Sequence, residues 1–186
     1  CVHCPAGYID HDSDPATPCD STDLHLCPAG SYAAVGSTEC ADCAPGYVDE
    51  DSDPSTPCSQ CAPGHQQTFA GATTCISCPE GRADTDLDSA TACELCENGF
   101  YAAQLSVLCS ACPPGEADLD DNPATACSVC EPGGYSDEAA TICDICQAGR
   151  FDDDSDASTP CLNCAAGTYT IGELSACTEC AIGRAD

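Results

Sequence analysis

Cysteine carries most of the chemistry available to this chain. The 186 residues include 22 cysteines, and nearly all of them fall in Cys-x2-Cys pairs, from Cys1 and Cys4 to Cys177 and Cys180, with one stretched pair at Cys19 and Cys27. Such pairs bind zinc as thiolates or form disulfides when oxidised. Zinc ribbons rarely run as an unbroken, evenly spaced array. Disulfides are therefore the preferred interpretation, with zinc as the alternative.

The order of the cysteines leaves two disulfide frameworks open, because spacing alone does not determine pairing. The preferred framework closes each loop on itself, with Cys1 and Cys180 pairing outside this stretch. Its bonds are Cys4–Cys19, Cys27–Cys40, Cys43–Cys58, Cys61–Cys75, Cys78–Cys93, Cys96–Cys109, Cys112–Cys127, Cys130–Cys143, Cys146–Cys161 and Cys164–Cys177. The rival framework interleaves bonds, for example Cys1–Cys19 with Cys4–Cys27. A closed loop of this length contributes about 3 kcal/mol in the chain-entropy model.

A second chemistry comes from oxygen-bearing side chains spaced two residues apart in every long loop. These ladders are Asp10, Asp12 and Asp14; Asp49, Asp51 and Asp53; Asp84, Asp86 and Asp88; Asp118 and Asp120 with Asn122; and Asp152, Asp154 and Asp156. Oxygen ligands at this spacing occupy the first positions of calcium loops, although the glycine and glutamate of an EF-hand are missing. The ladders predict either calcium sites or a solvated acidic face. No cofactor other than calcium is expected.

Hydroxyl groups offer a third, weaker signal. Thr-Pro steps at Thr17, Thr56 and Thr159 suit O-linked glycans. No arrangement of nucleophile, base and orienting group is visible, and a cysteine held in a disulfide cannot act as a nucleophile. We therefore expect no catalytic residues and no enzyme.

The elements that position these residues form a repeat. Acidic loops of fourteen residues alternate with loops of twelve or thirteen, which gives a double repeat of about 34 residues. The predicted units are 1–39 (with an insertion at 20–26), 40–74, 75–108, 109–142, 143–176 and the start of a sixth at 177–186. Because AIGRAD opens another acidic loop, we expect the array to continue.

A glycine lies near the start of each loop, as at Gly7, Gly30 and Gly46. Glycine there suits a turn with positive φ. Short β-hairpins and loops are expected, with almost no helix, because Gly, Pro and Asx recur every few residues. Each unit can contact only its neighbours. The predicted fold class is therefore a set of small disulfide-rich repeats in an extended linear, solenoid-like rod.

The amino-acid composition indicates which partners and which cellular location suit such a chain. Trp and Met are absent, and 32 acidic residues against three basic ones give a net charge of −29. A surface this acidic repels nucleic acids and anionic membranes, and its self-repulsion favours an extended shape. No apolar run is long enough for a membrane span. Dense cysteine favours an oxidising compartment, so the expected location is extracellular or at the cell surface.

The motif Cys-x-x-Gly-x-Tyr, followed some fifteen residues later by Cys and then by Cys-x2-Cys, resembles ephrin-receptor-like and TNF-receptor-like cysteine-rich repeats. CAAGTYTIGELSAC, from Cys164 to Cys177, is an example. The acidic loops, such as DSDPATPC, resemble those of tandem cysteine-rich surface proteins of algae and protists. In the receptor families such a loop is a small module with one internal disulfide. The resemblance therefore supports the closed-loop framework.

Two functions remain as predictions. The favoured one is a non-catalytic extracellular structural protein, a stalk or a filament subunit, whose partner is another copy of itself. The alternative is the ectodomain of a receptor or adhesin, stiffened by calcium, that binds another extracellular protein. Its first candidate contact is the insertion from Asp20 to Leu26. Neither function involves nucleic acid, or membrane contact within this stretch.

Overall fold

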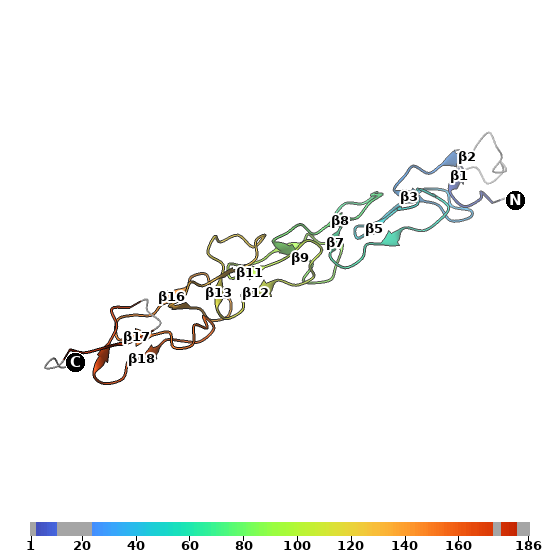
Figure 1. Ribbon diagram of the computed structural model, residues 1–186. Helices are drawn as coiled ribbons and strands as arrows, with labels where there is room; N and C mark the ends of the chain where they lie inside the picture. Colours follow the sequence, from blue (N-terminus) through green and yellow to red (C-terminus); the bar gives the residue numbers. More distant parts are fainter. Residues whose placement is uncertain (1–2, 11–23, 173–175, 182–186) are drawn as a thin grey trace. The chain divides into compact units, whose positions relative to one another are not determined.

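The computed structural model describes residues 3–10, 24–172 and 176–181. These residues contain no helix, and their strands pair in ten antiparallel sheets of two strands each (Figure 1). The prediction of short hairpins with almost no helix is confirmed. The fold class is therefore that of small disulfide-rich repeats.

Every strand is two or three residues long. The first ten are β1 (Tyr8–Asp10), β2 (Leu24–Leu26), β3 (Ser31–Tyr32), β4 (Ala41–Asp42), β5 (Tyr47–Val48), β6 (Ser59–Gln60), β7 (His65–Gln66), β8 (Ile76–Ser77), β9 (Arg82–Ala83) and β10 (Glu94–Leu95). The others are β11 (Phe100–Tyr101), β12 (Ser110–Ala111), β13 (Glu116–Ala117), β14 (Ser128–Val129), β15 (Gly134–Tyr135), β16 (Asp144–Ile145), β17 (Arg150–Phe151), β18 (Leu162–Asn163), β19 (Thr168–Tyr169) and β20 (Thr178–Glu179).

Each hairpin pairs the residues just after a loop glycine with the two residues inside the next Cys-x2-Cys pair. In the hairpin of β5 and β6, Tyr47 lies opposite Gln60 and Val48 opposite Ser59. An isolated two-stranded hairpin is at best marginally stable in water. Something other than strand pairing must therefore hold these hairpins closed.

Disulfides supply that closure. The described bonds are Cys27–Cys40, Cys43–Cys58, Cys61–Cys75, Cys78–Cys93, Cys96–Cys109, Cys112–Cys127, Cys130–Cys143, Cys146–Cys161 and Cys164–Cys177. All nine belong to the closed-loop framework. The bond from Cys27 to Cys40 excludes the interleaved bond between Cys4 and Cys27. Cys4 is also disulfide-bonded, but Cys19, its predicted partner, lies outside the described residues.

We call each closed loop a module. In long modules the two cysteines are 15 positions apart in the sequence, as in Cys43–Cys58, and in short modules they are 13 or 14 positions apart, as in Cys27–Cys40 and Cys61–Cys75. The cysteines of these loops bond to one another, so the structure does not form the alternative zinc ribbons.

The chain divides into two compact units. Unit 1 comprises Cys1–Pro79, Ala83–Glu94 and Gln104–Val107, and unit 2 comprises Glu80–Arg82, Leu95–Ala103 and Leu108–Asp186. Segments of the predicted double repeat 75–108 belong to both units. The double repeats are defined by the period of the sequence. That they are also structural domains stays a prediction.

The buried interior consists of cysteine and small side chains. Apart from Val48, every buried apolar side chain of the described residues is a cysteine or an alanine. Cys43, Cys78 and Cys112 are fully buried, whereas many large aliphatic side chains are more than half exposed. Disulfides therefore occupy the place of a hydrophobic core.

Backbone hydrogen bonds join each module to the next. In unit 1, the Gly46 amide donates to the Gln67 carbonyl at 2.7 Å, and the Gln67 amide donates to the Ser89 carbonyl at 2.7 Å. In unit 2, the Gly115 amide donates to Ser136, and the Ser136 amide donates to Ala157, both at 3.0 Å. Successive modules are thus linked by one repeated pattern of bonds.

The loop glycines are required for a second reason besides their turns. Gly64 has a φ of +80°, and a Cβ built there would lie 2.3 Å from the carbonyl oxygen of Leu105, which is two modules further along the chain. A Cβ built at Gly99 would likewise lie 2.2 Å from the carbonyl oxygen of Ala139. Since no side chain fits at these distances, modules of the same kind are stacked in direct backbone contact.

Glycine is needed at these positions for two reasons, a positive φ and the close approach of another module, and Gly149 has only the first. Its φ is +83°, but no atom lies within 4 Å of a Cβ built there. We expect Gly149→Ala to cost only the left-handed strain of about 1–2 kcal/mol. Exchange of the Cys164 amide, which bonds the Gly149 carbonyl, should then accelerate roughly 5- to 30-fold.

Gly64→Ala should instead remove all protection of the Cys78 amide, which bonds the Gly64 carbonyl. Residue-resolved hydrogen exchange of the two variants is the measurement. Equal effects of the two substitutions would show that backbone strain alone, and not stacking of the modules, requires glycine.

Candidate functional site

The first aspartate of each described ladder from the second to the fifth is buried and points into the preceding short module. Asp118 is 6% exposed, and its Oδ2 accepts the Gly99 amide at 3.0 Å. The same bond joins Asp49 to Gly30 and Asp84 to Gly64 at 3.0 Å, and Asp152 to Gly133 at 3.3 Å. A charged acceptor makes a stronger hydrogen bond than a neutral one. These four carboxylates hold neighbouring modules together.

The second and third ladder residues build a tight turn within their own module. Asp51 accepts the Asp53 amide at 3.0 Å, and Asp53 accepts the Ser55 amide at 2.9 Å. The Thr56 hydroxyl donates to the Asp51 carboxylate and to the Asp53 carbonyl. Equivalent bonds recur among Asp86, Asp88 and Thr91, among Asp120, Asn122 and Thr125, and among Asp154, Asp156 and Thr159. Asp and Asn favour such turns because their side chains bond the backbone two residues on.

Hydrogen bonds in these turns stabilise the ionised carboxylates. The Ser55 hydroxyl and amide lower the pKa of Asp53, and the Ser158 hydroxyl and amide lower the pKa of Asp156. The amide of Asp88, followed by the Thr91 hydroxyl, lowers the pKa of Asp86. A lowered pKa stabilises the folded turn above the ordinary aspartate pKa, and this contribution is lost as the pH falls through the lowered value.

The three ladder side chains of one loop therefore face different partners. Among residues 3–10, 24–172 and 176–181, no three His, Cys, Asp or Glu side chains are grouped so that they could hold a metal ion. Asp12 and Asp14 of the first ladder lie outside the described residues. Calcium binding stays a prediction, and the described side chains offer no assembled site for it.

Asn122, which was predicted as a third calcium ligand beside Asp118 and Asp120, occupies the same turn position as the third aspartate of the other ladders. Its side-chain oxygen accepts the Ala124 amide at 3.2 Å, as the third aspartate of the other ladders accepts an amide two residues on. Its backbone amide donates to Asp118 at 3.2 Å and to Asp120 at 3.1 Å. Asn122 therefore serves as a turn residue in this structure, and its role as a calcium ligand stays a prediction like that of the other ladder residues.

The predicted glycosylation sites also have partners in the turns. The hydroxyls of Thr56 and Thr159 both donate hydrogen bonds within their turns, and Thr17 lies outside the described residues. A glycan on Thr56 or Thr159 would remove the hydroxyl hydrogen that makes these bonds. O-glycosylation of these residues stays a prediction.

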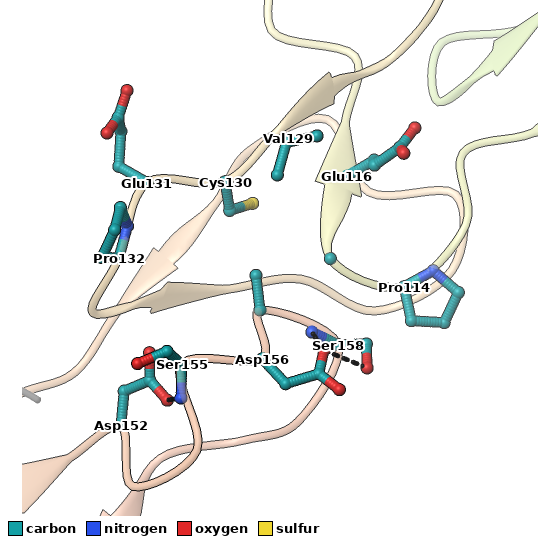
Figure 2. Close-up of a pocket in the computed structure, with 12 residues that line it drawn as sticks. Pro114, Glu116, Val129, Cys130, Glu131, Pro132, Asp152, Ser155, Asp156 and Ser158 are labelled. Carbon is teal, nitrogen blue, oxygen red and sulfur yellow. Dashed lines mark hydrogen bonds between the residues drawn. The ribbon is translucent and has the colours of Figure 1, made fainter.

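An acidic groove of about 610 Å³ lies in unit 2, between the start of one short module and the turn of the long module that follows. Figure 2 shows Val129 and Glu116 on one side of this groove, with Asp152 and Asp156 opposite. A similar groove in unit 1 is lined by Pro63, Asp84 and other residues at equivalent positions. The groove thus repeats with the module pattern.

The inward direction of the first ladder aspartate was not predicted, although the sequence carries a signal for it. Each long loop has aspartate at this position, whereas the next residue varies between His11, Glu50, Thr85, Leu119 and Asp153. An unchanging position beside a variable one indicates a specific contact of the first side chain.

No protein family model matches the chain, and no curated protein matches its sequence. The fold and the bonds described above define the class of protein as a tandem array of disulfide-bonded cysteine-rich repeats with small hairpins.

Adjacent aspartates allow a matched test of the carboxylate that joins two modules. Asp152 is 7% exposed and bonds Gly133, whereas Asp153 is exposed to solvent. Asp152→Ala should leave the buried Gly133 amide without its acceptor, at a cost of about 1–3 kcal/mol. Exchange of that amide should accelerate roughly 5- to 150-fold. Asp153→Ala controls for the loss of one negative charge and should leave the amide protected; equal acceleration in both variants would contradict the assignment.

The acid behaviour of the turns can be tested at Asp156. Ser158→Ala removes the hydroxyl donor but keeps the amide, so the pKa of Asp156 should rise toward the ordinary aspartate value. Carbon-detected NMR titration of the carboxylate measures the change. Ser55→Ala should raise the pKa of Asp53 and leave Asp156 unaffected. A titration midpoint of Asp156 that does not move in Ser158→Ala would show that the hydroxyl contributes nothing.

Proposed function

We propose that this protein is a non-catalytic extracellular structural protein, a stalk or filament subunit made of tandem cysteine-rich repeats. The observation that carries the proposal is the regular repetition of the joints between modules. Each of the nine described closed loops has one disulfide. The same backbone bonds recur between modules, and the same carboxylate bond joins the long modules that begin at Cys43, Cys78, Cys112 and Cys146 to the short module before them.

This joint suits a spacer because it adds length without requiring a common core. The hydrogen bonds named above act between neighbouring modules, so the stability of an array is approximately a sum of module and neighbour contributions. More modules then give a longer array of about the same local stability. A spacer or filament needs this property, and it gives no advantage to a protein built around one catalytic pocket.

An extracellular or cell-surface location is supported by the cysteine chemistry. Disulfides at this density persist in oxidising compartments and are rare in the cytosol. No helix among the described residues is long and apolar enough to cross a membrane. The net charge of −29 keeps individual arrays soluble through mutual repulsion. Lateral or end-to-end association of arrays would therefore need cations or short-range contacts to overcome this repulsion.

Electron microscopy of the native material, with and without EDTA, tests the proposal. We expect filaments or stalks with a regular axial repeat. Dissociation of filaments in EDTA would assign a bridging role to calcium, whereas persistence would show that short-range contacts between arrays hold the filaments together without it. Isolated particles that bind another protein through one repeat, with no regular assembly under either condition, would contradict the structural function.

A further inference from the structure

An apolar groove of about 510 Å³ lies in unit 2, where the fourth double repeat meets the fifth. Its lining includes Leu119, Val129, Pro132, Ile145 and the disulfide Cys130–Cys143. The three aliphatic side chains are 55%, 69% and 57% exposed. Nothing in the fold of the module requires them to be apolar, since they bury little surface.

Comparison of the repeats shows that this cluster is a departure from the pattern. The three positions are the seventh residue after the first cysteine of a long module and the residues just before the next two loop-opening cysteines. In the other double repeats these positions hold His11, Leu26 and Asp42; Glu50, Gln60 and Ser77; Thr85, Leu95 and Ala111; and Asp153, Asn163 and Glu179. Only the fourth double repeat brings three large aliphatic residues together.

Exposed aliphatic residues that stand singly need no explanation, and this chain has several. A contiguous exposed cluster is different, because it costs solubility and commonly marks an interaction site. In the second double repeat the three equivalent positions are polar (Glu50, Gln60 and Ser77), and its modules are joined by the same backbone bonds. Apolar residues at these positions are therefore not needed for stacking. Binding is the remaining physical reason for the cluster.

The acidic groove of Figure 2 adjoins this apolar groove, since the four residues Val129 to Pro132 line both. Glu131 belongs to both linings, and Glu116, Asp152 and Asp156 line the acidic groove alone. An apolar hollow therefore lies beside a concentration of carboxylates. A ligand that fits both would carry an apolar side chain next to positive charges.

We propose that the two adjoining grooves bind an extended, basic segment of a partner protein, with an aliphatic or aromatic side chain in the apolar groove. Arginine or lysine residues of that segment would face Glu116, Glu131 and Asp156. A second copy of this chain fits poorly, because it carries a net charge of −29 and only three basic residues. Two such copies repel one another unless cations intervene.

This site is independent of the proposed structural function, because a spacer can carry one docking repeat among many uniform ones. It differs from the contact first predicted for a receptor, the insertion 20–26, most of which lies outside the described residues. Assembly under the microscope and binding at this groove can therefore fail separately.

The test uses the full chain and a short synthetic peptide of alternating arginine and leucine. Methyl NMR should show shifts confined to Leu119, Val129, Ile145 and their neighbours on addition of the peptide. Val129→Gln places the residue of an equivalent position, Gln60, in the groove and should weaken binding at least about tenfold. A peptide with serine in place of leucine should lose a similar factor.

Leu95→Gln is the matched control, since Leu95 occupies the same hairpin position in the preceding double repeat and is 61% exposed. It should bind the peptide as well as the parent chain. Equal weakening by both substitutions, undiminished binding of Val129→Gln, or equal binding of the serine peptide would overturn the proposal. Sedimentation that revealed a dimer abolished by Val129→Gln would overturn it as well, by identifying a second copy as the occupant.

Discussion

Direct contact between the backbones of modules two positions apart in the chain is the constraint on which the rest of the structure depends. A loop glycine such as Gly64 lies so close to the module two further on that even a Cβ is excluded. At this separation no side chains can form a conventional core between modules. Cohesion must then come from backbone hydrogen bonds, from the buried carboxylates that bond Gly30, Gly64, Gly99 and Gly133, and from disulfides inside each module.

These bonds explain part of the acidic composition. In the second to fifth ladders, the first carboxylate bonds the preceding module, and the next two side chains form a turn within their own module. One run of alternating Asp or Asn residues therefore contributes both to the joint between modules and to the local turn. All buried side-chain nitrogen and oxygen atoms of the described residues have hydrogen-bond partners. Most of the other acidic side chains of the described residues are exposed, and their mutual repulsion helps to keep the chain soluble.

Much of the fold was predictable because it follows from local rules. The framework of closed loops was preferred from the sequence, with support from the resemblance to receptor repeats, although spacing alone left an interleaved framework open. The glycine at each loop start indicated a positive φ, which Gly46 and Gly81 adopt. The partner of Asp118 was not predictable, because an unchanging position in the repeats indicates a contact but does not identify the amide that makes it. The groove at Val129 also required the structure, since its three aliphatic residues come from three separate segments of the chain.

Deletion of residues 75–108 tests whether a module depends only on the modules one and two positions away from it. The deletion removes one period and lets Cys109 take the place of Cys75 as the partner of Cys61. We expect the shortened chain to fold, to form the bond Cys61–Cys109 along with the other closed loops, and to keep its thermal stability almost unchanged. Disulfide mapping and calorimetry are the measurements. Scrambled bonds or loss of structure in the modules far from the junction would contradict this expectation.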